Sequence, residues 1–246
     1  MPDRIAPEPD LADPLTWRPQ IARRSARPIA VRDPVCEPHW AGQHVLLHVD
    51  ATQEESTASP AVREPHVTSW IQLIDVDGRD VTDDDPDLTA EVAASILAAD
   101  AVVDGWLTDQ ASRTGAGTSI AETVRRTPID TFVSFTGRPP ELIVPPVIGH
   151  DGEGRTAFVA VDLLRVDGQV LLDLPLLERK RLLEGVVRQS DAVRITPYTR
   201  PPLKPWLVSW QSAGFEGAIL KAANSRYRPT TLSDEWAVIT RMEGVR

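Results

Sequence analysis

The sequence predicts an α+β fold in which strands and helices are mixed without a regular repeat. Short apolar runs suited to buried strands stand beside stretches whose apolar residues recur at helical spacing. The strand candidates do not alternate regularly with helices, which argues against a doubly wound parallel sheet. Of the 246 residues, 41% are hydrophobic and 25% are charged, so a packed core is expected.

Strands are expected where apolar, β-branched or aromatic residues form short runs. In chain order these runs cover residues 44–49, 70–76, 101–107, 157–166, 216–220 and 236–239. Two of the runs end at the dipeptides Asp77-Gly78 and Asp167-Gly168, which are typical of tight turns. The sequence therefore predicts a tight turn after each of these two strands.

Two segments have the apolar spacing of helices that bury one face. The first, 88–99, follows an acidic run at 83–87, which we interpret as the capped, solvated start of a helix rather than a metal site. The second, 175–187, begins at a proline and is amphipathic. Its solvent-facing side is expected to carry Glu178, Arg179, Lys180 and Arg181.

The chain is expected to divide into a leader and one domain. Residues 1–39 are rich in Pro, Arg and Asp, lack a hydrophobic period, and are interpreted as an extended or disordered leader to a domain at 40–246. Within that domain we expect a flexible connector at 112–118 and a proline-rich linker at 197–205. No apolar run is long enough to cross a membrane and no secretory signal is recognisable, so a cytoplasmic location is expected.

Charge and cysteine content narrow the function classes. The net charge of −10 disfavours tight binding to the DNA phosphate backbone, so DNA binding is expected to be weak or absent. The single cysteine, Cys36, excludes an intramolecular disulfide and a cysteine-based zinc cluster. The 26 cationic residues include three lysines, Lys180, Lys204 and Lys221, and none precedes residue 180.

Several segments in a fixed order resemble the nucleotidyltransferase (adenylation) domain of ATP-dependent DNA ligases. Residues 158–187 read FVAVDLLRVDGQVLLDLPLLERKRLLEGVV, and 216–236 read EGAILKAANSRYRPTTLSDEW. Residues 70–88 (WIQLIDVDGRDVTDDDPDL) and 101–107 (AVVDGWL) are similar to the family's "S-R-x-G" and "L-D-G-E-L" segments. The resemblance implies an ATP-grasp-like fold of mixed antiparallel sheets flanked by helices.

The chemistry that this resemblance implies uses ATP and a divalent metal such as Mg²⁺. In the family a lysine attacks the α-phosphate of ATP and forms a lysyl-AMP phosphoramidate. An arginine and two carboxylates orient the ribose and hold the metal, and two later lysines contact the phosphates. Family ligases also carry a following oligonucleotide-binding barrel. Only ten residues follow Trp236, so we expect an adenylation domain without that barrel.

The nucleophile of the family lies in a "K-x-D-G-x-R" motif on a strand before the "S-R-x-G" segment. Placed on the strand at 44–49, the motif lysine falls on His48, the glycine on Ala51 and the arginine on Gln53, while Asp50 is retained. Imidazole is a competent nucleophile, but the missing arginine and carboxylate would leave its transition state unsupported. A half-buried structural histidine is therefore the favoured interpretation of His48.

Other charged positions of the family pattern are also replaced. The "S-R-x-G" arginine falls on Val76 and the "D-G-E" glutamate on Trp106, which would fill part of the nucleotide pocket. The two lysines of the final "W-x-K-x-K" motif fall on Val238 and Thr240. The scaffold is kept, whereas most of the charged inner shell is lost.

Four residues are left as candidates for a residual nucleotide site: Asp50, Asp162, Glu216 and Lys221. Glu216 is also the candidate metal ligand, although the Glu216-Gly217 pair has an equally good structural explanation. This site is expected between the strands of His48, Asp162 and Glu216. Lys180 on a solvated helix face and Lys204 between prolines are not expected to act as nucleophiles.

Three functions are compatible with this sequence. The favoured one is a catalytically inactive binding or regulatory module in DNA repair, partnered by an active DNA ligase or another repair protein. The alternative is a nucleotidyltransferase or ligase that still binds ATP and acts through unrecognised residues or a partner. The third is a structural domain without a ligand.

Overall fold

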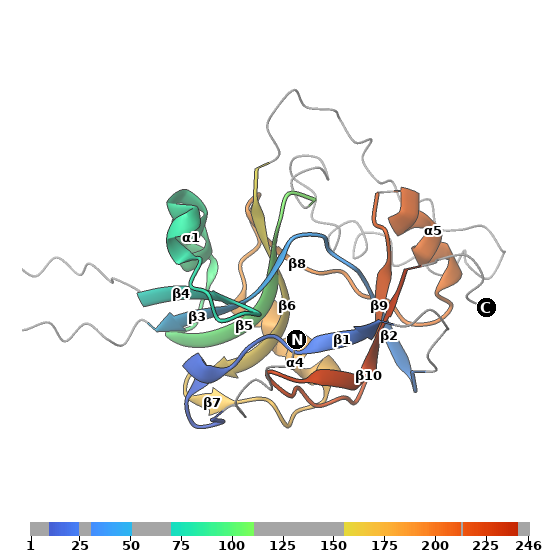
Figure 1. Ribbon diagram of the computed structural model, residues 1–246, viewed down its shortest axis with the longest axis horizontal. Coiled ribbons are helices and arrows are strands. Elements are labelled where there is room, and N and C mark those ends of the chain that lie inside the picture. Colours follow the sequence, from blue (N-terminus) through green and yellow to red (C-terminus); the bar gives the residue numbers. More distant parts are fainter. Residues whose placement is uncertain (1–9, 25–30, 51–69, 111–154, 213, 241–246) are drawn as a thin grey trace, which may run out of the picture.

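Two β-sheets lying side by side make up the centre of the molecule. The computed structural model describes residues 10–24, 31–50, 70–110, 155–212 and 214–240 (Figure 1). A six-stranded sheet occupies one half of the molecule and a four-stranded sheet the other, with helices on the outside. The fold is α+β, as the sequence predicts.

The large sheet has the strand order β4-β3-β5-β6-β7, and β8 pairs with β6. Its strands are β3 (Gln43–Asp50), β4 (Trp70–Asp75), β5 (Asp100–Thr108), β6 (Ala157–Val166), β7 (Gln169–Val170) and β8 (Val193–Ile195). Neighbours are antiparallel except β6 and β8. Val45 and Leu47 face one core cluster and Leu46 faces another, so β3 is apolar on both sides.

The small sheet has the order β1-β10-β9-β2. Its strands are β1 (Ile21–Arg24), β2 (Pro34–Pro38), β9 (Ala218–Ala222) and β10 (Leu232–Ile239). β1 runs parallel to β10, and the other two pairs are antiparallel. Trp17 and Trp236 pack with Leu46 of the large sheet in one buried cluster, which joins the two sheets.

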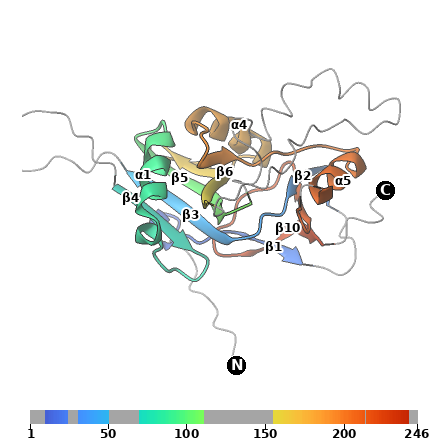
Figure 2. The ribbon, with the colours of Figure 1, turned by 90° about the horizontal axis from the view of Figure 1, so that it is seen from above.

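The helices cover the outer faces (Figure 2). They are α1 (Pro86–Ser95), α4 (Leu176–Val186) and α5 (Lys204–Ser212), with short 3-10 turns at Pro14–Thr16 and Thr82–Asp84. The Asp85 carboxylate caps α1 by accepting the Leu88 N–H at 3.0 Å, so the acidic run starts a helix. No helix in the described ranges is long and apolar enough to cross a membrane.

The expectation of an unstructured leader is wrong for residues 10–24 and 31–39. Trp17 is fully buried, and strands β1 and β2 complete the small sheet. Their partner strands lie some two hundred residues later in the chain, so no local pattern reveals the pairing. The proposed connector at 112–118 lies outside the described residues.

The prediction that Arg179 and Lys180 face solvent is also wrong. Arg179 is 0% exposed and Lys180 is 2% exposed, whereas Glu178 and Arg181 are exposed as expected. The two buried cations are paired with the carboxylates of Asp162 and Glu37. Their helix is enclosed on a second side by residues of the small sheet, because Leu176 packs against Val35 and Ala223.

Candidate functional site

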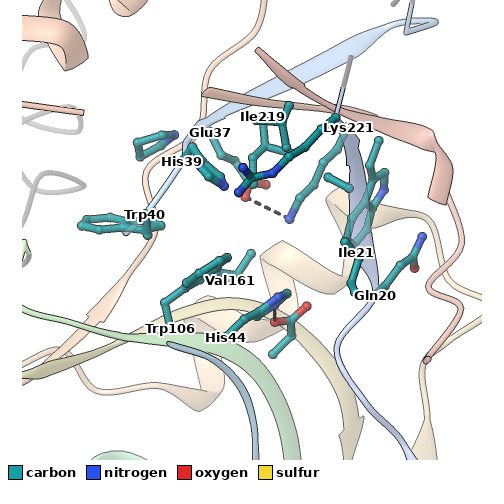
Figure 3. A pocket seen from close by; sticks show the side chains of 16 residues that line it. Gln20, Ile21, Glu37, His39, Trp40, His44, Trp106, Val161, Ile219 and Lys221 are labelled. Atoms are coloured by element: carbon teal, nitrogen blue, oxygen red, sulfur yellow. Dashed lines mark hydrogen bonds and ion pairs between the residues drawn. The ribbon is translucent and has the colours of Figure 1, made fainter. Parts of the chain in front are cut away.

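A pocket lies between the two sheets, with a cavity volume of about 90 Å³ (Figure 3). Both sheets contribute to its lining. The charged and aromatic side chains that define it are Arg24, Glu37, His39, Trp40, His44, Asp104, Trp106, Lys221 and Trp236. The rest of the lining comes from Gln20 and from apolar positions of β1, β2, β6, β9 and β10, among them Val161, Ile219 and Val238.

One wall of the pocket is built on Glu37, a buried carboxylate that holds two ammonium groups. Its Oε1 lies 2.7 Å from the Lys180 Nζ and its Oε2 lies 3.0 Å from the Lys221 Nζ. Burial alone would raise the pKa of Glu37, but the two lysines outweigh it and hold that pKa below its usual value. Glu37 is therefore an ionised carboxylate at neutral pH, placed between two ammonium groups.

The two lysines differ in how they meet the pocket. Lys221 lines it, and its ammonium also lies 4.3 Å from the centre of the Trp236 ring. Lys180 lies behind Glu37 and also donates to the Val161 carbonyl at 2.9 Å. Burial lowers the pKa of Lys180, although Glu37 acts in the opposite direction. Both ammonium groups are thus held in place by fixed acceptors.

The opposite wall rests on a buried chain of hydrogen bonds. The His44 Nε2 lies 2.6 Å from the Asp104 Oδ1, and the Tyr227 hydroxyl donates to the Asp104 Oδ2 at 2.8 Å. Burial acts to raise the pKa of Asp104, but His44, Lys221 and Tyr227 together bring it below its usual value. Burial and the neighbouring Asp104 raise the pKa of Tyr227 well above its ordinary range.

Trp106 stacks on this wall. His44 and Trp106 are directly opposite each other on β3 and β5, and their rings lie parallel with centroids 4.5 Å apart and an interplanar angle of 4°. His39 approaches Trp106 edge-on, at 5.9 Å between centroids and 75° between planes. Figure 3 shows Trp106 and His44 close together, with His39 above them beside Glu37.

His39 follows β2 and turns its ring into the pocket (Figure 3). Its backbone N–H donates to the Gly217 carbonyl at 3.0 Å, which fixes the chain at this point. Burial, with help from the charges of Arg24 and His44, lowers the pKa of His39 against the opposing effect of Glu216. The imidazole is consequently neutral at pH 7.

The segment that enters the pocket has the spacing of the nucleophile motif. From His39 to His44 it reads H-W-A-G-Q-H, so the lysine, aspartate and arginine of "K-x-D-G-x-R" become His39, Ala41 and His44, while Gly42 is retained. Gly42 has φ +135°, and a Cβ there would lie 2.1 Å from the Leu107 carbonyl oxygen. Only glycine fits this turn, which explains why it survives.

The structure does not bring His48 or Asp50 to this pocket. His48 is 3% exposed within β3, and its Nε2 has no hydrogen-bond partner among the described residues. Burial and the charges of Arg18 and Arg165 lower its pKa to about 4. Asp50 ends β3, opposite Trp70. The sequence pattern places the motif on the strand itself, whereas the residues that meet the pocket lie in the turn leading into that strand.

Of the other sequence candidates, Lys221 alone lines the pocket as described. Asp162 is fully buried, and both of its oxygens are held by Arg179, at 2.9 Å from Nε and 2.8 Å from Nη2. Glu216 is exposed and reaches the site only through its charge, which raises the pKa of His39. Glu37, His39 and His44 escaped sequence reasoning, although the glycine at position 42 was a usable signal.

The residues present do not fit a Mg²⁺ site or a whole ATP molecule. Among the described residues, no group of three or more His, Cys, Asp or Glu side chains could hold a metal ion. Asp104 and Asp162 are engaged by neighbouring side chains, and Trp106 stands where the family has a carboxylate. The cavity of about 90 Å³ is also small beside the roughly 300–1,000 Å³ of typical ligand pockets.

Comparison with known proteins gives one family. The model of the ATP dependent DNA ligase domain matches residues 69–239. A DNA ligase of Methanocorpusculum labreanum is 32% identical over 95 residues, which are 37% of this chain and 17% of that protein.

Two solved structures share the fold. The ligase domain of M. tuberculosis LigD is 21% identical, with a TM-score of 0.58 over 93% of this chain and 60% of that one. A mycobacterial DNA ligase D complexed with ATP and MES is 20% identical, with a TM-score of 0.57 over 92% of this chain and 60% of that one. The chain thus spans about 60% of the length of these two solved chains.

The matched segment runs from the start of β4 to the end of β10 and so includes Asp104, Trp106 and Lys221 of the pocket. It covers well over half of the chain. The glycine of the nucleophile motif, Gly42, precedes the matched segment and lies in the turn that leads into β3. The chain belongs to the ATP-dependent DNA ligase domain family.

Proposed function

We propose that this protein is a DNA ligase-like domain that does not form the lysyl-AMP intermediate and acts as a binding or regulatory module in DNA repair. Its partner is an active DNA ligase or another repair protein. The observation that carries the proposal is the pocket itself, where His39 stands at the nucleophile position of the motif. Without a reactive lysine at that position, the first step of the family's reaction has no attacking amine.

The three lysines of the chain offer no substitute. The Lys221 ammonium is engaged by the Glu37 carboxylate at 3.0 Å and by the Trp236 ring at 4.3 Å. Lys180 is pinned behind Glu37 by two acceptors. Lys204 is exposed at the start of α5 and does not line the pocket.

The groups that would stabilise charge during phosphoryl transfer are replaced as well. His44 occupies the motif arginine position, and Trp106 occupies that of a carboxylate. Val238, at the position of a phosphate-binding lysine, lines the pocket with an apolar side chain. Because such preorganised charges supply much of the rate of phosphoryl transfer, loss of all three supports an inactive pocket.

The charge of the chain favours a protein partner. A net charge of −10 repels the DNA phosphate backbone, whereas repair complexes can hold an acidic domain through protein contacts. The family's scaffold is intact, with buried networks around Glu37, Asp104 and Asp162. A stable fold with a disabled pocket is compatible with a role as a binding module.

Labelling with ATP tests the catalytic half of the proposal. The protein is incubated with Mg²⁺ and ATP labelled at the α-phosphate, then denatured and separated on a gel beside an active ATP-dependent DNA ligase. We expect label on the active ligase and none on this protein. Label lost in Lys221→Ala would reveal a displaced lysine nucleophile. Label lost in His39→Ala would instead support nucleotidyl transfer to imidazole, the alternative function.

A nick-sealing assay tests the regulatory half. Purified protein is added in increasing amounts to an active ATP-dependent DNA ligase with nicked DNA, and kcat/KM for sealing is measured. We expect a saturable change in kcat/KM. A rate that stays constant up to a large molar excess would contradict regulation of that ligase by direct contact. An unrelated acidic protein of similar size serves as the control for nonspecific effects.

A further inference from the structure

The Trp106–His44 pair replaces two charged residues by two stacked rings. In the family pattern the position of His44 is an arginine and that of Trp106 a glutamate, and the structure shows that these positions are directly opposite on β3 and β5. Here the rings are parallel at 4.5 Å. A pair of groups that could hold a polar ligand has become a hydrophobic contact within the protein.

The Trp106 side chain is held in place by two neighbouring rings, those of His44 and His39. The His44 ring on which it stacks is held by Asp104 at 2.6 Å, and Asp104 is held by Tyr227 at 2.8 Å. Asp104 and Tyr227 are both buried, so the support of the His44 ring is anchored in the protein interior. The edge of His39 closes a second side of the indole. Trp106 is therefore a rigid part of the pocket wall.

The cavity beside Trp106 is small, so the volume of this side chain affects which ligands can enter. At about 90 Å³ the cavity is several-fold smaller than the roughly 300–1,000 Å³ of small-molecule sites. Trp106 lines the pocket together with Trp40 and Trp236, and it is the indole that stacks on His44 (Figure 3). Its replacement by a smaller side chain would join the volume of the indole to the existing cavity.

We propose that Trp106 is the specificity-determining residue of the pocket and that it excludes adenine nucleotides by occupying the space they need. This inference rests on the proposed function in one respect, namely that the pocket corresponds to the family's nucleotide site. It goes further by assigning the exclusion to one side chain. The remaining groups, among them Lys221 and the neutral His39, stay available to a nucleotide once the indole is removed.

Binding of AMP tests the inference. AMP has no pyrophosphate to leave, so its binding is independent of any adenylation activity. Isothermal titration calorimetry with AMP is carried out on the unaltered protein and on Trp106→Ala and Trp106→Glu. We expect no measurable binding to the unaltered protein, and for Trp106→Ala a Kd at least tenfold below the detection limit of the measurement. Trp106→Glu, which restores the family's charge, should bind AMP more tightly with Mg²⁺ than without it.

Trp70→Ala is the matched control, because Trp70 is an exposed tryptophan of the large sheet that does not line the pocket. It should bind AMP no better than the unaltered protein. Equal binding by the unaltered protein and Trp106→Ala overturns the inference, and so does the absence of binding in both. If thermal melting shows that Trp106→Ala is unfolded, Trp106→Leu retains an apolar contact with His44 and decides the same question. If the AMP-binding results contradict this inference, the test of adenylation by labelled ATP remains valid on its own.

Discussion

At the scale of single residues, the buried charges are the most sensitive points of the molecule. Glu37 is 1% exposed and balances Lys180 and Lys221, each of them 2% exposed. Removing one partner of a buried ion pair leaves an uncompensated charge in the protein interior, where the dielectric constant is low. We therefore expect Glu37→Gln to lower the free energy of unfolding by about 3–5 kcal/mol, measured by chemical denaturation.

Glu178→Gln is the control for this change. Glu178 forms an exposed ion pair with Arg181 at 3.1 Å, with side-chain exposures of 53% and 70%. Such pairs contribute little, so the free energy of unfolding should change by less than about 1 kcal/mol. A similar effect of both substitutions would contradict the role assigned to Glu37.

His48 gives the molecule a pH dependence on the acid side. Burial lowers its pKa from 6.5 to about 4, so the unfolded chain binds a proton in this range that the folded chain does not. Stability is therefore full above about pH 7 and falls as the pH drops from 6.5 towards 4. Between pH 7 and pH 5 the loss from His48 should be about 2 kcal/mol.

Urea denaturation of the unaltered protein and of His48→Leu at both pH values measures this contribution. Leucine also removes the unpaired Nε2, so the variant should be at least as stable at pH 7. Its free energy of unfolding should fall less between pH 7 and pH 5 than that of the unaltered protein. An identical fall in both proteins would show that His48 is not the titrating group.

At the scale of secondary-structure elements, the turn into β3 depends on one glycine. Gly42 has φ +135°, and a Cβ would lie 2.1 Å from the Leu107 carbonyl oxygen. Gly42→Ala should cost at least about 1–3 kcal/mol of stability and displace His39 and His44 from the pocket. Gly185 in α4 is the matched control, because an added Cβ there meets nothing within 4 Å. Gly185→Ala should stabilise the helix by roughly 0.5–1 kcal/mol, and thermal melting compares the two variants.

Elements with a strong local pattern could be predicted from the sequence. β6 lies where the apolar run at 157–166 predicted a strand, and α4 begins one residue after Pro175. α5 was missed because its start at Lys204 lies inside a proline-rich segment that favours a linker. Elements are thus predictable to the extent that their own residues specify them.

At the scale of the whole molecule, the two sheets are joined by residues that the sequence assigned to a leader. Trp17 is fully buried against Leu46 of the large sheet and Trp236 of the small sheet. Trp17→Ala should cost about 3–5 kcal/mol, because it leaves a cavity between the sheets. Trp70→Ala, at a tryptophan that is 38% exposed, should change stability by less than about 1 kcal/mol. A small effect of Trp17→Ala in thermal melting would show that the sheets hold together without it.

The site was harder to predict than the fold because it depends on contacts between residues that are far apart in the sequence. The sequence pattern placed the motif glycine on Ala51, after the apolar strand, whereas the glycine that meets β5 is Gly42, before that strand, and no spacing reveals this contact. The burial of Lys180 depends on Glu37, which lies 143 positions earlier in the chain (180 minus 37). The spacing of charged residues identifies the charged face of a helix, but it cannot show whether a carboxylate from a distant strand packs against that face.

The ion cluster of Glu37, Lys180 and Lys221 has a consequence for how such proteins change over generations. Its members support the fold by mutual pairing, so selection for stability alone would be enough to keep them in a domain without a catalytic role. The glycine at position 42 is retained for the same kind of reason. The number of retained motif residues is therefore a poor measure of catalytic activity. The positions that inform about activity are those at which the family's side chain is replaced, as at positions 39, 106 and 238.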